Sequence, residues 1–127
     1  MPTQQMIKLE GYFDPDDLRE FITSSIQSLD LAGKRVIVLV PDQTRTMPLP
    51  MVFEALTDAL AGRVHALDFI VALGTHPPLN QDQLSRLFGR RVRDSRIGKH
   101  QFFNHTWHEP ETLRNIGVIP GEEMKAL

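Results

Sequence analysis

Two short apolar runs constrain the fold of this chain more than any other feature of its sequence. Residues 35–40 (RVIVLV) are rich in β-branched side chains and show almost no polar alternation, a pattern typical of a strand buried on both faces of a parallel sheet. Residues 66–73 (ALDFIVAL) form a second run of this kind, which Gly74 and then Pro77-Pro78 end. We therefore expect two central strands.

A helix is expected between the two strands. Residues 41–50 contain three prolines and several polar residues, which indicates a loop, and Pro50 suits the first turn of a helix. A strand, a helix and a second strand in this order favour parallel strands joined by a right-handed crossover. The helix should end at Gly62, and the residues assigned to its inward face are Val52, Leu56, Ala59 and Leu60.

Two more helices carry recognisable start and stop signals. The first helix is expected to begin at Asp14-Pro15-Asp16-Asp17, because Asp14 can accept hydrogen bonds from free backbone N–H groups. Asn80 is expected to begin another helix in the same way. Gly33 and Gly89 are the expected ends. The residues expected to face the core are Leu18, Phe21, Ile22, Ile26 and Leu29 in the first helix, and Leu84, Leu87 and Phe88 in the second.

The remaining segments have weaker patterns. Residues 90–100 are basic and are interpreted as a solvent-facing loop, whereas residues 101–107 are interpreted as a further strand. Residues 113–119 are expected to form a short helical turn and then the start of a strand. We therefore predict a single α/β domain over residues 1–127, with a Rossmann-like parallel or mostly parallel sheet and flanking helices.

The composition excludes several classes of function. A chain of 127 residues with 41% hydrophobic content can build one core, and a net charge of −2 argues against nucleic acid or an anionic membrane as a partner. The absence of cysteine excludes disulfides, thiolate metal ligands and a cysteine nucleophile. No basic and apolar leader begins the chain, so we expect a cytoplasmic location.

Polar residues follow both apolar runs at the point where each expected strand ends. Residues 42–45 (Asp-Gln-Thr-Arg) come directly after the first run, and residues 74–76 (Gly-Thr-His) come directly after the second. In an open parallel sheet, ligands bind beyond the carboxyl ends of the strands, where neighbouring loops converge. We therefore expect these two loops to form one crevice.

The residue types in this crevice suit a small anionic substrate. Arg45 offers a planar fork that matches a carboxylate or a phosphate, Asp42 can orient that arginine or a ligand hydroxyl, and His76 can move a proton near neutral pH. Alternatively, Asp42 and Arg45 only close their loop by a local salt bridge, and His76 is a capping or surface residue.

Two other clusters are interpreted as non-functional. The spacing of His100, His105 and His108 lies outside any expected helix, and no fourth ligand is placed with the three histidines, so we do not predict a metal site there. The basic residues between 90 and 99 could contact the phosphates of a nucleic acid, but the overall charge balance favours a solvated surface.

Residues 41–56 (PDQTRTMPLPMVFEAL) and 69–84 (FIVALGTHPPLNQDQL) resemble two loop-and-helix motifs of the nickel-dependent lactate racemase family, in the same order. These are its Asp-x-Thr-Arg loop and its Gly-Thr-His-x-Pro loop. A weaker similarity covers Asn104-His105 and the following ETLRNIG, so the resemblance extends from about residue 34 to about residue 117.

The resemblance implies a two-domain enzyme of which this chain is the N-terminal part. Such enzymes use a nickel-pincer nucleotide to accept and return a hydride at the 2-carbon of a 2-hydroxy acid, while a histidine removes the hydroxyl proton. By this similarity, His76 is one of two acid/base histidines and Arg45 grips the substrate carboxylate. His105 is expected to be structural.

The same resemblance assigns the other loop residues. It implies that Asp42 and Thr44 shape the loop around the substrate or the cofactor phosphate, and that Gly74 and Thr75 contact the cofactor. The family's second catalytic histidine, its cofactor-tethering lysine and its nickel-binding histidine have no counterpart here. We therefore expect this chain to be inactive alone and to need a C-terminal domain or a partner chain, with a homo-oligomer as a further prediction. The alternative function is a non-catalytic domain that binds a small anion.

Overall fold

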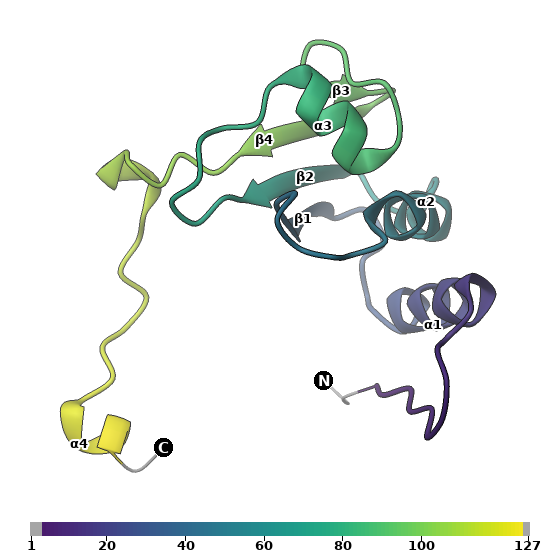
Figure 1. The fold of residues 1–127 in the computed structure, drawn as a ribbon, viewed down its shortest axis with the longest axis horizontal. Helices are drawn as coiled ribbons and strands as arrows, with labels where there is room; N and C mark the ends of the chain where they lie inside the picture. The colour runs from purple at the N-terminus through teal and green to yellow at the C-terminus, as the bar shows by residue number, and fades with distance from the viewer. Residues whose placement is uncertain (1–3, 126–127) are drawn as a thin grey trace.

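The computed structural model describes residues 4–125 and confirms the predicted α/β fold with a mostly parallel sheet (Figure 1). The helices and strands in chain order are α1 (Pro15–Gln27), β1 (Arg35–Pro41), α2 (Leu49–Leu60), β2 (Ala66–Ala72), α3 (Gln81–Phe88), β3 (Arg96–Ile97), β4 (His100–Asn104), the short 3-10 helix η1 (Pro110–Thr112) and α4 (Gly121–Lys125). None of the helices within residues 4–125 is long and apolar enough to cross a membrane.

The sheet has the strand order β1-β2-β4-β3. Strands β1 and β2 are parallel, as expected, and their register runs from Arg35 opposite Ala66 to Pro41 opposite Ala72. The strand expected at residues 101–107 is β4, which pairs in parallel with β2. Strand β3 was not expected, because it is only two residues long and lies in the basic segment that was interpreted as a loop.

The helix starts agree with the sequence signals. Asp14 accepts a hydrogen bond from the backbone N–H of Asp17, and the Asp17 side chain accepts one in return, so the start of α1 is a capping box. Asn80 and Gln83 form the same arrangement at the start of α3. Helix α3 ends at Gly89 with a φ of 66°, a left-handed conformation that favours glycine.

The core is centred on four phenylalanines, each of which lies within 6 Å of the other three, measured between ring centroids. These rings come from α2, β2, α3 and β4, so one aromatic cluster joins helices α2 and α3 to the two inner strands of the sheet, β2 and β4. Phe53 was absent from the expected inward face of α2, although it is the residue that contacts the other three elements. The four residues are Phe53, Phe69, Phe88 and Phe102.

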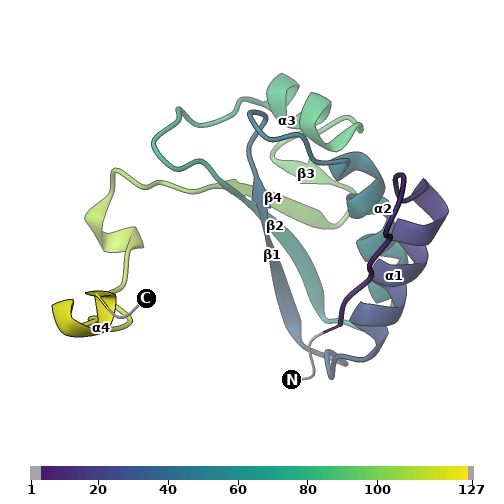
Figure 2. The same cartoon turned by 60° about the horizontal axis from the view of Figure 1, so that its bottom comes forward.

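The expectation that residues 35–40 are buried on both faces is wrong. Along β1 exposure alternates, and Leu39 is 71% exposed whereas Val40 is 2% exposed. The physical reason is that α1, α2 and α3 all lie on one side of the sheet (Figure 2). Within residues 4–125, nothing covers the opposite face, and Ile37 and Phe103 are exposed there with Leu39.

The segment after β4 also differs from expectation. The helical turn lies earlier than expected, in η1 at residues 110–112, and residues 113–119 contain neither a helix nor a strand. This segment runs away from the sheet (Figure 1), and Ile116 within it is 99% exposed. Its apolar residues therefore contribute little to the core that residues 4–125 build.

Two leucines on opposite faces of the sheet provide a test of this one-sided core. Leu67 on β2 is 3% exposed and faces the helices, whereas Leu39 faces the uncovered side. We expect Leu67→Ala to lower the free energy of unfolding by about 2–5 kcal/mol, because it leaves a cavity. Leu39→Ala should lower it by less than about 1 kcal/mol. Urea unfolding of the two variants measures this, and equal losses would contradict the one-sided core.

Candidate functional site

The two loops expected to meet are adjacent at the carboxyl ends of β1 and β2. Pro41 and Ala72 are the last paired residues of these strands, so both loops leave the sheet at the same edge. Asp42 follows β1 directly, and His76 lies four residues after the end of β2. The strand register therefore positions both side chains.

His76 Nδ1 donates a hydrogen bond to Asp42 Oδ2. Asp42 is 5% exposed, whereas the His76 side chain is 55% exposed. An aspartate at Nδ1 fixes the ring orientation and leaves Nε2 as the nitrogen that can exchange a proton with a ligand. No hydrogen bond to Nε2 is present among the described residues.

Thr44 holds the other oxygen of the same carboxylate. Its backbone N–H and its hydroxyl donate to Asp42 Oδ1 at 3.0 and 2.6 Å. These bonds, and then the pairing with His76, hold the pKa of the Asp42 carboxyl at about 2, below its ordinary value. Asp42 is therefore a carboxylate at all physiological pH values.

Arg45 and His76 line the same hollow, of about 270 Å³, together with the loop residues between β2 and His76. Among the described residues, Asp42 pairs with His76 and not with Arg45. The alternative in which a salt bridge between Asp42 and Arg45 closes the loop is therefore not what the structure shows. The residues that line the hollow are Pro41, Asp42, Thr44, Arg45, Ala72, Leu73, Gly74, Thr75 and His76.

The sequence patterns did not predict the pairing of Asp42 with His76. Asp42 was expected to orient Arg45 or a ligand hydroxyl, and His76 was considered alone. The available signal was that both residues follow strands expected to be parallel neighbours. That signal places the loops together but does not say which side chains meet, because the loop conformations decide it.

The other histidines do not form a second site. His100 Nδ1 donates a hydrogen bond to the carbonyl of Leu67 at 2.8 Å, and the ring packs against that of Phe53. Within residues 4–125, no group of three or more histidine, aspartate or glutamate side chains could hold a metal ion.

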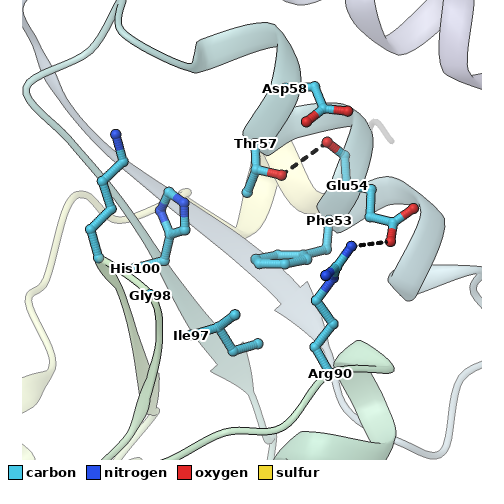
Figure 3. A pocket seen from close by; sticks show the side chains of 9 residues that line it. Phe53, Glu54, Thr57, Asp58, Arg90, Ile97, Gly98 and His100 are labelled. Atoms are coloured by element: carbon cyan, nitrogen blue, oxygen red, sulfur yellow. Dashed lines mark hydrogen bonds and ion pairs between the residues drawn. The ribbon is translucent and has the colours of Figure 1, made fainter.

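A larger hollow of about 420 Å³ lies beside α2 and the start of β4 (Figure 3). Its charged groups largely neutralise one another: Arg90 donates to Glu54 at 2.6 Å and thereby lowers the pKa of that carboxyl, with Arg19 3.6 Å away. Arg90 is thus an ion-pair partner as well as a solvent-facing residue. Asp58, Lys99 and His100 also line this hollow, but among the described residues none of them is paired with a buried carboxylate as His76 is, so the hollow beside His76 is the better candidate site.

Comparison with known proteins shows the family to which the chain belongs. The chain matches the family model for the lactate racemase N-terminal domain over residues 17–124. No curated protein sequence matches the chain. Among solved structures, it is similar to a crystal structure of a protein from Thermotoga maritima, with a TM-score of 0.73 and 24% identity.

The structural match covers 91% of this chain but only 27% of the Thermotoga protein. At that identity, the likeness shows the fold alone. The family match spans most of the chain, including both loops of the site and the helices that follow them. The chain therefore belongs to the lactate racemase N-terminal domain family.

Proposed function

We propose that this chain supplies the N-terminal half of the active site of a lactate racemase-like isomerase that acts on a small 2-hydroxy acid. The observation that carries the proposal is the Asp42–His76 pair beside Arg45 in one hollow. A 2-hydroxy acid carries a hydroxyl group, which needs a proton-transfer group, and a carboxylate, which needs a carboxylate-binding group. Both kinds of group lie at one edge of the sheet here.

His76 is the proposed acid/base group. Its Nε2 takes the proton of the substrate hydroxyl and later returns one, while Asp42 keeps Nδ1 protonated and stabilises the imidazolium that forms. Thr44 keeps that carboxylate in place through its two hydrogen bonds. We therefore propose that Asp42 and Thr44 act mainly through His76, in addition to the loop-shaping role that the resemblance implies.

Arg45 is the proposed carboxylate-binding group. Its guanidinium can hold a carboxylate through two parallel hydrogen bonds, which would fix the substrate in one orientation. Gly74 and Thr75 line the same hollow. They offer backbone and hydroxyl groups to an anionic ligand, and we propose that they contact the cofactor.

The family resemblance implies a nickel-pincer nucleotide, which would supply the hydride chemistry at the substrate's 2-carbon when bound. Within residues 4–125, no three metal-binding side chains come together, so these residues offer no complete nickel site of their own. The hollow beside Arg45 fits an anionic group such as a phosphate, but not the metal. We therefore assign no step to the cofactor on this chain.

We propose that a C-terminal domain, in the same chain or on a partner chain, completes the site. The chain spans only 27% of the Thermotoga protein, and the matching family model is that of an N-terminal domain. The uncovered sheet face supports this, because Leu39 and Phe103 lie on it within the last three residues of their strands, near the site edge. The cytoplasmic location and the homo-oligomer stay predictions.

The proposed roles can be separated by kinetics in the complete or reconstituted enzyme. His76→Ala should lower kcat by about 10²–10⁴-fold with little change in KM, because an acid/base group acts on the reacting proton. Arg45→Lys keeps the charge but loses the planar fork, so KM should rise while kcat falls. Normal turnover by His76→Ala would favour the alternative function, a domain that only binds a small anion.

The isolated chain should retain no stoichiometric nickel. Its described residues contain no group of three metal-binding side chains, and single histidines bind the ion weakly. Dialysis against a mild chelator, followed by metal analysis, measures this. One nickel ion per chain after dialysis would contradict the assignment of the metal to another part of the protein.

The ionised Asp42 also makes stability depend on pH. A carboxyl whose pKa is lowered by folding stabilises the protein above the ordinary aspartate value of about 4 and loses that contribution as the pH falls to about 2. In urea unfolding, the free energy of unfolding of the wild type should therefore exceed that of Asp42→Asn by a smaller amount at pH 2 than at pH 4. An advantage that is constant over this range would show that the charge of Asp42 is not stabilised by its partners.

A further inference from the structure

The side chain of Asn104 makes two hydrogen bonds to one residue of the loop that carries His76. Asn104 Oδ1 accepts from the backbone N–H of Leu79 at 3.0 Å, and Asn104 Nδ2 donates to the backbone carbonyl of Leu79 at 2.9 Å. Among common side chains, only a carboxamide can donate and accept side by side in this way. Asn104 therefore binds the loop as a neighbouring strand would.

Leu79 is a fixed point from which the loop can be held. Its side chain is buried in the core, and Pro77-Pro78 separate it from His76. The two prolines have restricted φ angles and no N–H groups, so this stretch is stiff but cannot anchor itself by donating hydrogen bonds. A displacement at Leu79 is therefore passed along the stiff segment to His76.

The segment that follows β4 contacts the other end of this stiff stretch. Trp107 Nε1 donates to the carbonyl of His76 at 3.3 Å, and the backbone N–H of His105 donates to the carbonyl of Val71 at 3.1 Å. The chain around Asn104 is thus attached both to β2 and to the loop. Asn104 makes the most specific of these contacts, because it uses both polar groups of its side chain.

We propose that Asn104 is a positioning residue that holds the His76 imidazole against Asp42 by fixing Leu79 through paired backbone hydrogen bonds. The claim that this positioning affects catalysis rests on the proposed function of His76. The claim that Asn104 positions the ring does not, because it concerns only whether the Asp42–His76 pair forms in the folded chain. Asn104 thus acts on His76 from a third strand, whereas Asp42 acts on it from β1.

Asn104→Ala and Asn104→Asp test the proposal in the isolated chain by NMR. The alanine removes both hydrogen bonds. The aspartate can still accept from the Leu79 N–H but places a carboxylate oxygen against the Leu79 carbonyl, so it disturbs the same contact without shortening the side chain. Asn115→Ala is the matched control, because Asn115 also accepts a backbone hydrogen bond, from Gly117, but lies in the exposed C-terminal segment.

Two signals are measured at neutral pH. The first is amide hydrogen exchange at Leu79, with the buried residue Phe69 as the reference for global stability. The second is the pair of ¹⁵N signals of the His76 ring, which report which nitrogen carries the proton and whether Nδ1 is paired. The same ring signals in Asp42→Asn define the unpaired state.

We expect Leu79 exchange in Asn104→Ala to be at least about tenfold faster relative to Phe69. The His76 ring signals should move toward those of Asp42→Asn in both Asn104 variants, whereas Asn115→Ala should match the wild type. Ring signals that stay at their wild-type positions while Leu79 exchange accelerates would overturn the proposal, since Asn104 would then only stabilise the loop.

The assembled enzyme separates this proposal from the proposed function. Asn104→Ala should lower kcat by about tenfold with an unchanged KM, because Arg45 is on a different loop. If the ring signals move but neither Asn104→Ala nor His76→Ala affects turnover, the positioning role stands and the catalytic role of His76 fails. If the ring signals do not move, the positioning role fails whatever the kinetics show.

Discussion

The parallel register between β1 and β2 is the constraint on which the rest of the site depends. It ends with Pro41 opposite Ala72, so the two loops begin side by side although Asp42 and His76 are 34 residues apart in sequence. A shift of one residue would turn the end of β1 over and point Asp42 to the opposite face of the sheet. The hydrogen bond between Asp42 and His76 is therefore a consequence of the strand register and not of any local sequence preference.

The features that could be predicted from the sequence are those whose partners lie close together along the chain. Asp14 with Asp17, and Asn80 with Gln83, satisfy each other within one helical turn, so a local pattern is enough to place both helix starts. The order of apolar runs and turn residues also predicted the parallel pairing of β1 and β2, although β1 is an edge strand of the sheet and not a central one. The edge of the sheet where ligands are expected follows from that pairing alone.

The features that could not be predicted depend on which distant elements cover a surface. The run RVIVLV is compatible with burial on one face or on both, and the choice is made by helices elsewhere. Strand β3 is too short for a periodic pattern. The Asp42–His76 pair requires two loop conformations to agree within hydrogen-bond distance, which no spacing rule specifies.

The described contacts divide the support of His76 between two strands. Asp42 holds the imidazole ring through its charge, and that charge is maintained by hydrogen bonds from Thr44 at the end of β1. Asn104 at the end of β4 holds the backbone through Leu79 without any charge. Protonation of Asp42 would therefore release the imidazole ring but leave the loop in place. Loss of the Asn104 contacts would instead move the loop, and the ring would separate from a carboxylate that is still ionised. The position of His76 thus depends on two physically different interactions, and each can be disturbed while the other stays intact.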